Sequence, residues 1–223
     1  MNTKSTSYFK DVLSSVERTI GKLGFVQRRR GIFLLPLSDD CVAFLGLNKA
    51  DIGSQEIEVN PVIGIRHTPI ERLVAEVSDM RFDPVVPPTL AGNIGYMTPN
   101  DKYLSFVFRG QRELDLVAAE LSETITRYGL PFINNLTSLR NLVAAMTTVR
   151  FRNTIIVDYR IPAGYYLLNE VDNAVSFLNE RLKLLEGRSD AAAQQYIRFA
   201  GRLLSRCGRD TCQGKQPLAE SSI

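Results

Sequence analysis

Residues 41–65 read CVAFLGLNKADIGSQEIEVNPVIGI, and this stretch decides the fold that the sequence predicts. The apolar run at 41–47 predicts one buried strand, and the alternating residues from Ile57 onward predict another, with a break near Pro61. The polar segment 48–54 between them is typical of a loop. Parallel neighbours need a crossover connection longer than this loop, so we expect the two strands to pair antiparallel.

Further elements are expected on both sides of this strand pair. Apolar residues at spacings of three and four indicate amphipathic helices, and β-branched runs bounded by turn residues indicate strands. Thr68, Pro69 and Glu71 follow the pattern of a helix start closed by a capping box. The expected elements are helices at 7–23, 67–80 and 111–128 and strands at 25–35, 91–97 and 103–108.

Together these elements predict an α+β fold, with an antiparallel sheet of about five strands and helices on one face. Gly129-Leu130-Pro131 is expected to end the helix that starts near residue 111. The chain then becomes helical, and short turns between the helices indicate helical hairpins. The expected helices lie at 132–146, 152–168, 171–186 and 189–207, although FRNTIIV at 151–157 is also compatible with a strand.

The organisation that follows has three parts. Residues 1–130 form the predicted sheet domain, residues 131–208 form a helical region, and residues 209–223 form a polar tail that is expected to be disordered. A chain of 223 residues with 44% hydrophobic residues is long enough to bury a sizeable core.

The charge is distributed unevenly along the chain. The formal net charge of +3 is too small to indicate nucleic-acid binding by itself. Residues 1–139 hold 15 basic and 16 acidic side chains, whereas residues 140–223 hold 12 basic and 8 acidic ones. We therefore expect any anionic partner to prefer the C-terminal third.

Cysteine content and hydropathy bear on the compartment. The three cysteines, Cys41, Cys207 and Cys212, are odd in number and suggest no disulfide framework. The N-terminal residues lack the apolar segment of a signal peptide, and no apolar run approaches the roughly 20 residues that span a bilayer. These features predict a protein of a reducing, cytoplasmic compartment with no membrane partner.

Residues suited to catalysis or metal binding are sparse. His67 is the only histidine, and its position before a helix favours a loop or capping role over a catalytic one. Cys207 and Cys212 are separated by four residues without a second pair, so we expect no metal site. No glycine-rich phosphate-binding motif occurs, and hence no cofactor is expected.

Three other patterns have structural interpretations. The glycines of Gly92–Tyr96 indicate a bulge or a close backbone approach inside a strand. Asp39 and Asp40 are typical of a turn, and Glu56 and Glu58 of a solvated or edge face of a strand.

Arginines are the better candidates for binding. Arg198, Arg202, Arg206 and Arg209 follow helical spacings and form one stripe, opposite Ala193, Ile197, Ala200 and Leu204. The stripe is either the solvated face of an amphipathic helix or a contact to phosphate or to an acidic protein.

The adjacent residues Arg28, Arg29 and Arg30 are a second candidate. Neighbouring side chains of a strand point to opposite faces, so the three cannot share one surface unless a bulge or a frayed start lets all of them reach water. We expect the strand to begin near Gly31, with these arginines in its exposed start.

The helix ending in LGF, the basic cluster, and the strands GIFLL and CVAFLGLN resemble an uncharacterised bacterial family of small domains of unknown function. The resemblance covers mainly residues 8–48, and Phe33 is followed by Leu34 where that family usually has an arginine. It implies a stand-alone domain of the immunity or accessory kind, and no catalytic residue transfers from it.

Two hypotheses of function follow, and a third stays open. The first is a non-enzymatic protein-binding module of the immunity-like or accessory-subunit kind. Its expected partner is a protein with an acidic surface. The alternative is a nucleic-acid-associated protein that uses the stripe together with Arg150, Arg152 and Arg160. The third is an enzyme built around His67 with acidic partners.

Overall fold

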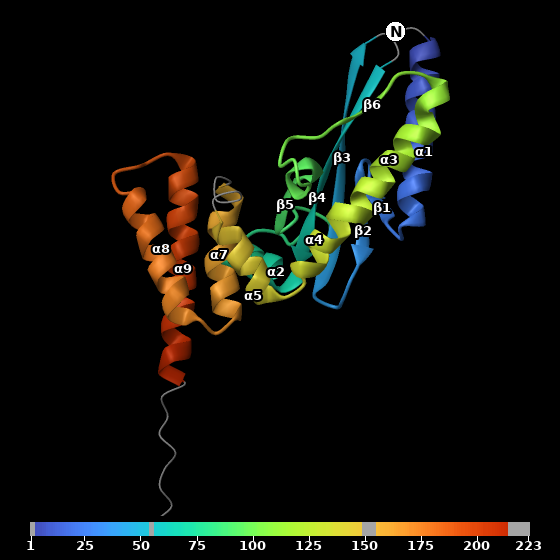
Figure 1. Cartoon of the computed structure of the whole chain (residues 1–223). Helices are drawn as coiled ribbons and strands as arrows, with labels where there is room; N and C mark the ends of the chain where they lie inside the picture. The colour runs from blue at the N-terminus through green and yellow to red at the C-terminus, as the bar shows by residue number, and fades with distance from the viewer. Residues whose placement is uncertain (1–2, 54–55, 149–154, 214–223) are drawn as a thin grey trace, which may run out of the picture. The chain divides into compact units, whose positions relative to one another are not determined.

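The structure, a computed structural model, describes residues 3–53, 56–148 and 155–213 (Figure 1). The chain divides into two compact units. The first takes in the described residues of 1–68 and 83–142, and the second those of 69–82 and 143–223. The division is therefore not a single cut, because a segment from the middle of the sheet region belongs to the helical unit.

The first unit contains the sheet and the helices next to it (Figure 1). Its elements are α1 (Thr3–Lys22), β1 (Val26–Arg29), β2 (Ile32–Pro36), β3 (Cys41–Gly53), β4 (Glu56–His67), β5 (Leu90–Asn93), β6 (Phe106–Phe108), α3 (Leu114–Thr124), the π-helical turn η3 (Ile125–Gly129) and α4 (Leu130–Asn135).

The predicted α+β class and the antiparallel sheet are confirmed. Six strands pair antiparallel in the described chain, in the order β1-β2-β3-β4-β5, and β6 also pairs with β4. The sheet thus has one strand more than the five expected. One detail differs from the prediction: β3 continues through the expected loop as far as Gly53. β5 and β6 both pair with β4.

Pro61 does not break β4, contrary to the prediction. The N–H of Leu47 donates to the carbonyl of Gly31 at 2.7 Å, so Leu47 and Pro61, which lie opposite each other, are not hydrogen-bonded together. The ring nitrogen of Pro61 therefore faces away from β3. On that side β6 pairs with residues 57–59 and β5 with residues 62–65, so proline lies where neither strand requires a donor.

The helix after β6 does not end at Gly129-Leu130-Pro131. It continues through η3 into α4, and the N–H of Leu130 donates to the carbonyl of Ile125 in a wider π turn. Gly129 lies close to the sheet, because a Cβ atom there would lie 2.4 Å from Cδ1 of Ile63 in β4 and that side chain would have to shift. The glycine lets the helix approach the sheet instead of terminating it.

The second unit contains α2 (Thr68–Val77), α7 (Ile155–Leu167), α8 (Val171–Leu184) and α9 (Ala191–Gln213), and α5 (Leu139–Thr147) leads into it. Helix α9 runs six residues beyond the predicted end at 207, so residues 209–213 are helical and not a disordered tail. Residues 214–223 lie outside the described residues, as do residues 151–154 of the FRNTIIV segment.

Glu71 and Arg160 form a buried ion pair inside this unit. Nε and one terminal nitrogen of Arg160 donate to the two carboxylate oxygens of Glu71 at 2.6 and 2.8 Å, and both side chains are only 5% exposed. Besides any capping contact at the start of α2, the Glu71 carboxylate therefore holds α2 against α7. This pair explains why α2 belongs to the helical unit.

Replacement of Arg160 by Met should leave the Glu71 carboxylate buried without this cation. We expect the free energy of unfolding to fall by about 3–5 kcal/mol, measured by urea denaturation. The double variant Glu71→Leu/Arg160→Met removes both charges and should recover most of the loss. Wild-type stability of the single variant would show that the pair does not hold α2.

Glycines offer a second test of the packing. Gly129→Ala should lower the free energy of unfolding, since crowding a packed core costs about 1–3 kcal/mol. Gly201→Ala is the matched control, because a Cβ atom at Gly201 in α9 meets nothing within 4 Å. That variant should gain about 0.5–1 kcal/mol from helix propensity in the same urea experiment. Equal effects of both variants would contradict the close approach at Gly129.

Candidate functional site

Helix α9 buries part of the face that the sequence predicted, because Ala193 and Ala200 are buried. Ile197 and Leu204 are only half-buried at the side of this face. Aromatic rings pack within it: the centroid of the Tyr159 ring of α7 lies 5.1 Å from that of Tyr196 and 4.8 Å from that of Phe199. The buried residues of α9 are Ala193, Tyr196, Phe199, Ala200, Leu203 and Cys207.

The arginine stripe lies along a hollow between α9 and α2, which we call the arginine groove. Its volume is about 510 Å³. All four arginines of the stripe line it, and α2 contributes one acidic and one apolar side chain. The lining residues are Glu76, Val77, Ile197, Arg198, Gly201, Arg202, Ser205, Arg206 and Arg209.

Arg206 and Arg202 are held by groups of the same unit. Arg206 donates to the carboxylate of Glu76 at 2.9 Å and to the hydroxyl of Tyr166 at 3.1 Å, and the Tyr166 hydrogen bond raises the pKa of the guanidinium. Arg202 donates to the carbonyl of Val77 at 3.1 Å. These two arginines join α9 to α2, so half of the stripe has a structural role.

Arg198 and Arg209 differ from the other two arginines. Both are exposed, and neither forms a hydrogen bond or ion pair with another described side chain. Between them lies Gly201, where a Cβ atom would meet nothing within 4 Å. The groove therefore has an open middle and two guanidinium groups that are available to a ligand.

The other basic candidate, Arg28 to Arg30, lies in a β-hairpin of the first unit and not at the start of one strand. Arg28 falls at a register shift between Gln27 and Arg29, and Arg30 begins the turn to β2. The bulge allows all three arginines to be exposed. Because β1 is an edge strand, this cluster also protects the sheet from pairing with another chain.

Arg29 is engaged within the first unit. Its guanidinium lies 2.6 Å from the carboxylate of Asp83. Asp83 also accepts hydrogen bonds from the N–H groups of Val85 and Val86 at 2.8 and 3.1 Å. The hydrogen bond from Arg29 is the largest cause that lowers the pKa of Asp83 to about 2, and the two backbone N–H groups lower it further.

The remaining candidates are buried or lie outside the described residues. His67 is buried at the end of β4, and its backbone N–H donates to the hydroxyl of Thr89 at 2.9 Å. Cys207 is buried, whereas nothing is described of the Cys212 side chain. Arg150 and Arg152 lie outside the described residues. No group of three or more His, Cys, Asp or Glu residues suited to a metal ion occurs in the described part.

The segment Gly92–Tyr96 is not one strand. β5 ends at Asn93, and Ile94–Met97 form a 3₁₀ turn. The predicted close backbone approach is confirmed at Gly95, where a Cβ atom would lie 2.0 Å from the carbonyl of Lys102. The acidic pair Asp39 and Asp40 is exposed in the turn before β3, as expected.

Comparison with protein family models, with curated proteins and with solved structures finds no match. Among the described helices, none combines the length and the hydropathy that crossing a bilayer requires. The function must therefore be argued from the geometry of the chain itself.

Replacement of Arg29 by Gln should raise the pKa of Asp83 from about 2 toward its ordinary value of about 3.9. Because the folded-state pKa is lowered, the contact favours the folded state above about pH 4 and is lost as the pH falls toward 2. Carboxyl chemical shifts in an NMR titration measure both values. Asp190, whose pKa is lowered by the N–H of Ala193 and by Arg188, is the internal control and should not change.

Proposed function

We propose that this protein is a protein-binding module and that the arginine groove holds an acidic segment of its partner. The observation that carries the proposal is the pair Arg198 and Arg209, which are exposed and form no hydrogen bond or ion pair with another described side chain. They lie on either side of the open position at Gly201. Guanidinium groups bind carboxylates with paired hydrogen bonds, which suits an acidic segment.

The rest of the lining favours a peptide. Val77 and Ile197 supply apolar surface, against which the side chains of a peptide segment can pack. Their contribution would come from burial of apolar area, in addition to the charge pairing. A segment that alternates acidic and apolar residues therefore matches the groove best.

The alternative partner, nucleic acid, is supported less well by the same lining. Glu76 places a carboxylate in the groove, and it already neutralises Arg206. No aromatic side chain belongs to the lining, so bases would have no ring to stack on. The charge of Arg198 and Arg209 remains the one feature that also suits phosphates.

The test separates charge from shape. Arg198→Glu/Arg209→Glu reverses the two available charges but leaves the contacts of Arg202 and Arg206 intact. Gly201→Leu fills the open middle of the groove without a change of charge, and it should fold because the position is unobstructed. The tagged protein captures its partner from an extract of the source organism, and the purified pair is then titrated. The charge-reversal variant should weaken binding at least about tenfold, since hydrogen bonds to charged groups contribute about 1.5–3 kcal/mol each. Gly201→Leu should also weaken binding, because its side chain occupies the space of the bound segment.

The matched control is Lys10→Glu/Lys22→Glu on α1, which changes the net charge equally at two exposed lysines far along the sequence. It should bind like the wild type. Binding that survives both groove variants would remove the groove from the interaction. If single-stranded DNA binds through the groove instead, each lost phosphate contact should reduce the log–log salt slope by about 0.7, which would favour the alternative.

A further inference from the structure

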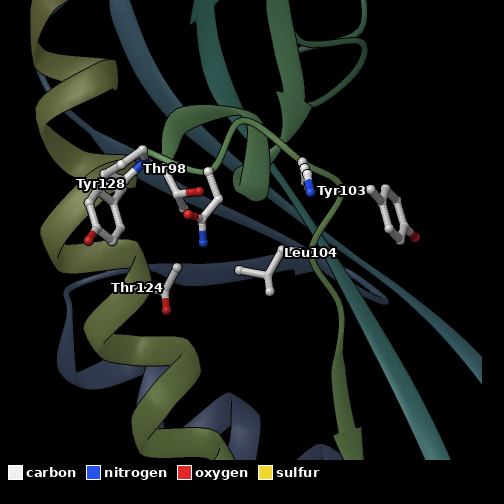
Figure 2. Close-up of a pocket in the computed structure, with 8 residues that line it drawn as sticks. Thr98, Tyr103, Leu104, Thr124 and Tyr128 are labelled. Atoms are coloured by element: carbon white, nitrogen blue, oxygen red, sulfur yellow. The ribbon is translucent and has the colours of Figure 1, made fainter.

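A second hollow lies in the first unit, between the segment at 98–104 and the end of α3 (Figure 2). Its volume is about 590 Å³, within the range of about 300–1,000 Å³ that is usual for small-molecule sites. Figure 2 shows Thr124 and Tyr128 on the helix, facing Thr98 and Leu104 of the segment opposite. The lining residues are Thr98, Pro99, Asn100, Lys102, Tyr103, Leu104, Thr124 and Tyr128.

The segment on one side of this hollow is held in place by a buried asparagine. The side-chain oxygen of Asn93 accepts the N–H groups of Gly95 and Leu104 at 3.0 and 2.9 Å, and its amide donates to the carbonyl of Leu104 at 2.9 Å. Gly95 lies against the carbonyl of Lys102 with no room for a Cβ atom. The segment is therefore ordered before any ligand arrives, which lowers the entropy cost of binding.

The other side is shaped by the π turn. η3 spans residues 125–129, and Gly129 anchors it on Ile63 of the sheet. Tyr128 precedes this anchor and lines the hollow, half-buried. The guanidinium of Arg127 lies 5.4 Å from the centroid of the Tyr128 ring and restrains it. π turns of this kind are frequent at functional sites.

The hydroxyl groups of the two threonines in the lining can act only as hydrogen-bond acceptors toward a ligand. Thr98 donates its hydroxyl proton to the carbonyl of Gly95 at 2.8 Å, and Thr124 donates its proton to the carbonyl of Glu120 at 2.8 Å. Each threonine oxygen therefore offers only lone pairs to the hollow. A ligand next to Thr98 and Thr124 must supply O–H or N–H donors, as a polyol does.

Lys102 gives the hollow its charge. It is exposed, forms no ion pair with the described residues, and is the only charged side chain in the lining. No carboxylate belongs to the lining itself, and the nearby Glu58 carboxylate acts electrostatically on Tyr103. The ammonium group therefore favours a negative charge at its end of the hollow.

We infer that this hollow binds a sugar-sized polyol that carries one anionic group, such as a sugar acid or a sugar phosphate. The hydroxyl groups of the ligand donate to Thr98 and Thr124, the Tyr128 ring packs against its carbon skeleton, and Lys102 meets its anionic group. The inference is independent of the arginine groove, because it rests on different residues and on the first unit alone.

The experiment titrates the whole chain with D-glucuronate, glucose 6-phosphate and glucose, followed by protein NMR chemical shifts. The two anionic sugars should give saturable shifts at Thr124 and Tyr128, and glucose should bind more weakly. The tighter of the two anions identifies the anionic group. Thr124→Val and Lys102→Gln should each weaken binding at least about fivefold, the effect expected for one lost hydrogen bond.

Matched controls exist for both variants. Thr126 donates to the carbonyl of Ser122 at 2.9 Å just as Thr124 does to Glu120, but it does not line the hollow. Thr126→Val and Lys10→Gln should therefore bind like the wild type, with melting temperatures measured for all variants. The inference is overturned if neither anionic sugar binds saturably, if the controls weaken binding as much as the lining variants, or if glucose binds as tightly as the anions.

Discussion

The buried pairing of Arg160 with Glu71 is the contact on which the second unit depends. Two charges that are each 5% exposed are tolerated in an interior only when they are paired and hydrogen-bonded, as these are at 2.6 and 2.8 Å. The pair fixes α2 against α7, and α2 carries Glu76 and Val77 on its last turn. Those residues form one wall of the arginine groove, so the pair helps to position that wall.

Local patterns predicted the fold class because they report burial directly. The alternation in β4 and the short connections between strands were sufficient for an antiparallel sheet. The errors arose where a local signal was outweighed by a neighbour. Pro61 is typical of a strand break, but it lies between the residues that pair with β5 and those that pair with β6, where no N–H donor is required. Gly129 is typical of a helix end, but here it lets the helix contact Ile63. The turn at Arg30 and Gly31, which separates β1 from β2, was not predicted because it follows directly on a run of arginines.

The candidate site was predicted in part. Helical spacing placed all four arginines of the stripe on one face, and they do line one groove. Glu76 and Tyr166 could not be predicted as their partners, because Arg206 is separated from them by 130 and 40 residues, and no local period encodes such contacts. The glycine at position 201, inside an otherwise helical pattern, was a sequence signal of this open position.

The choice of arginine along the stripe has different causes at different positions. Arg206 bonds a carboxylate and a hydroxyl and lies 5.5 Å from the centroid of the Tyr166 ring, a combination that a planar guanidinium achieves and a lysine ammonium does not. Arg202 similarly holds the carbonyl of Val77. The described contacts therefore explain arginine at these two positions by the packing of α9 on α2. They give no such reason at Arg198 and Arg209, and a binding role for the stripe rests on those two residues.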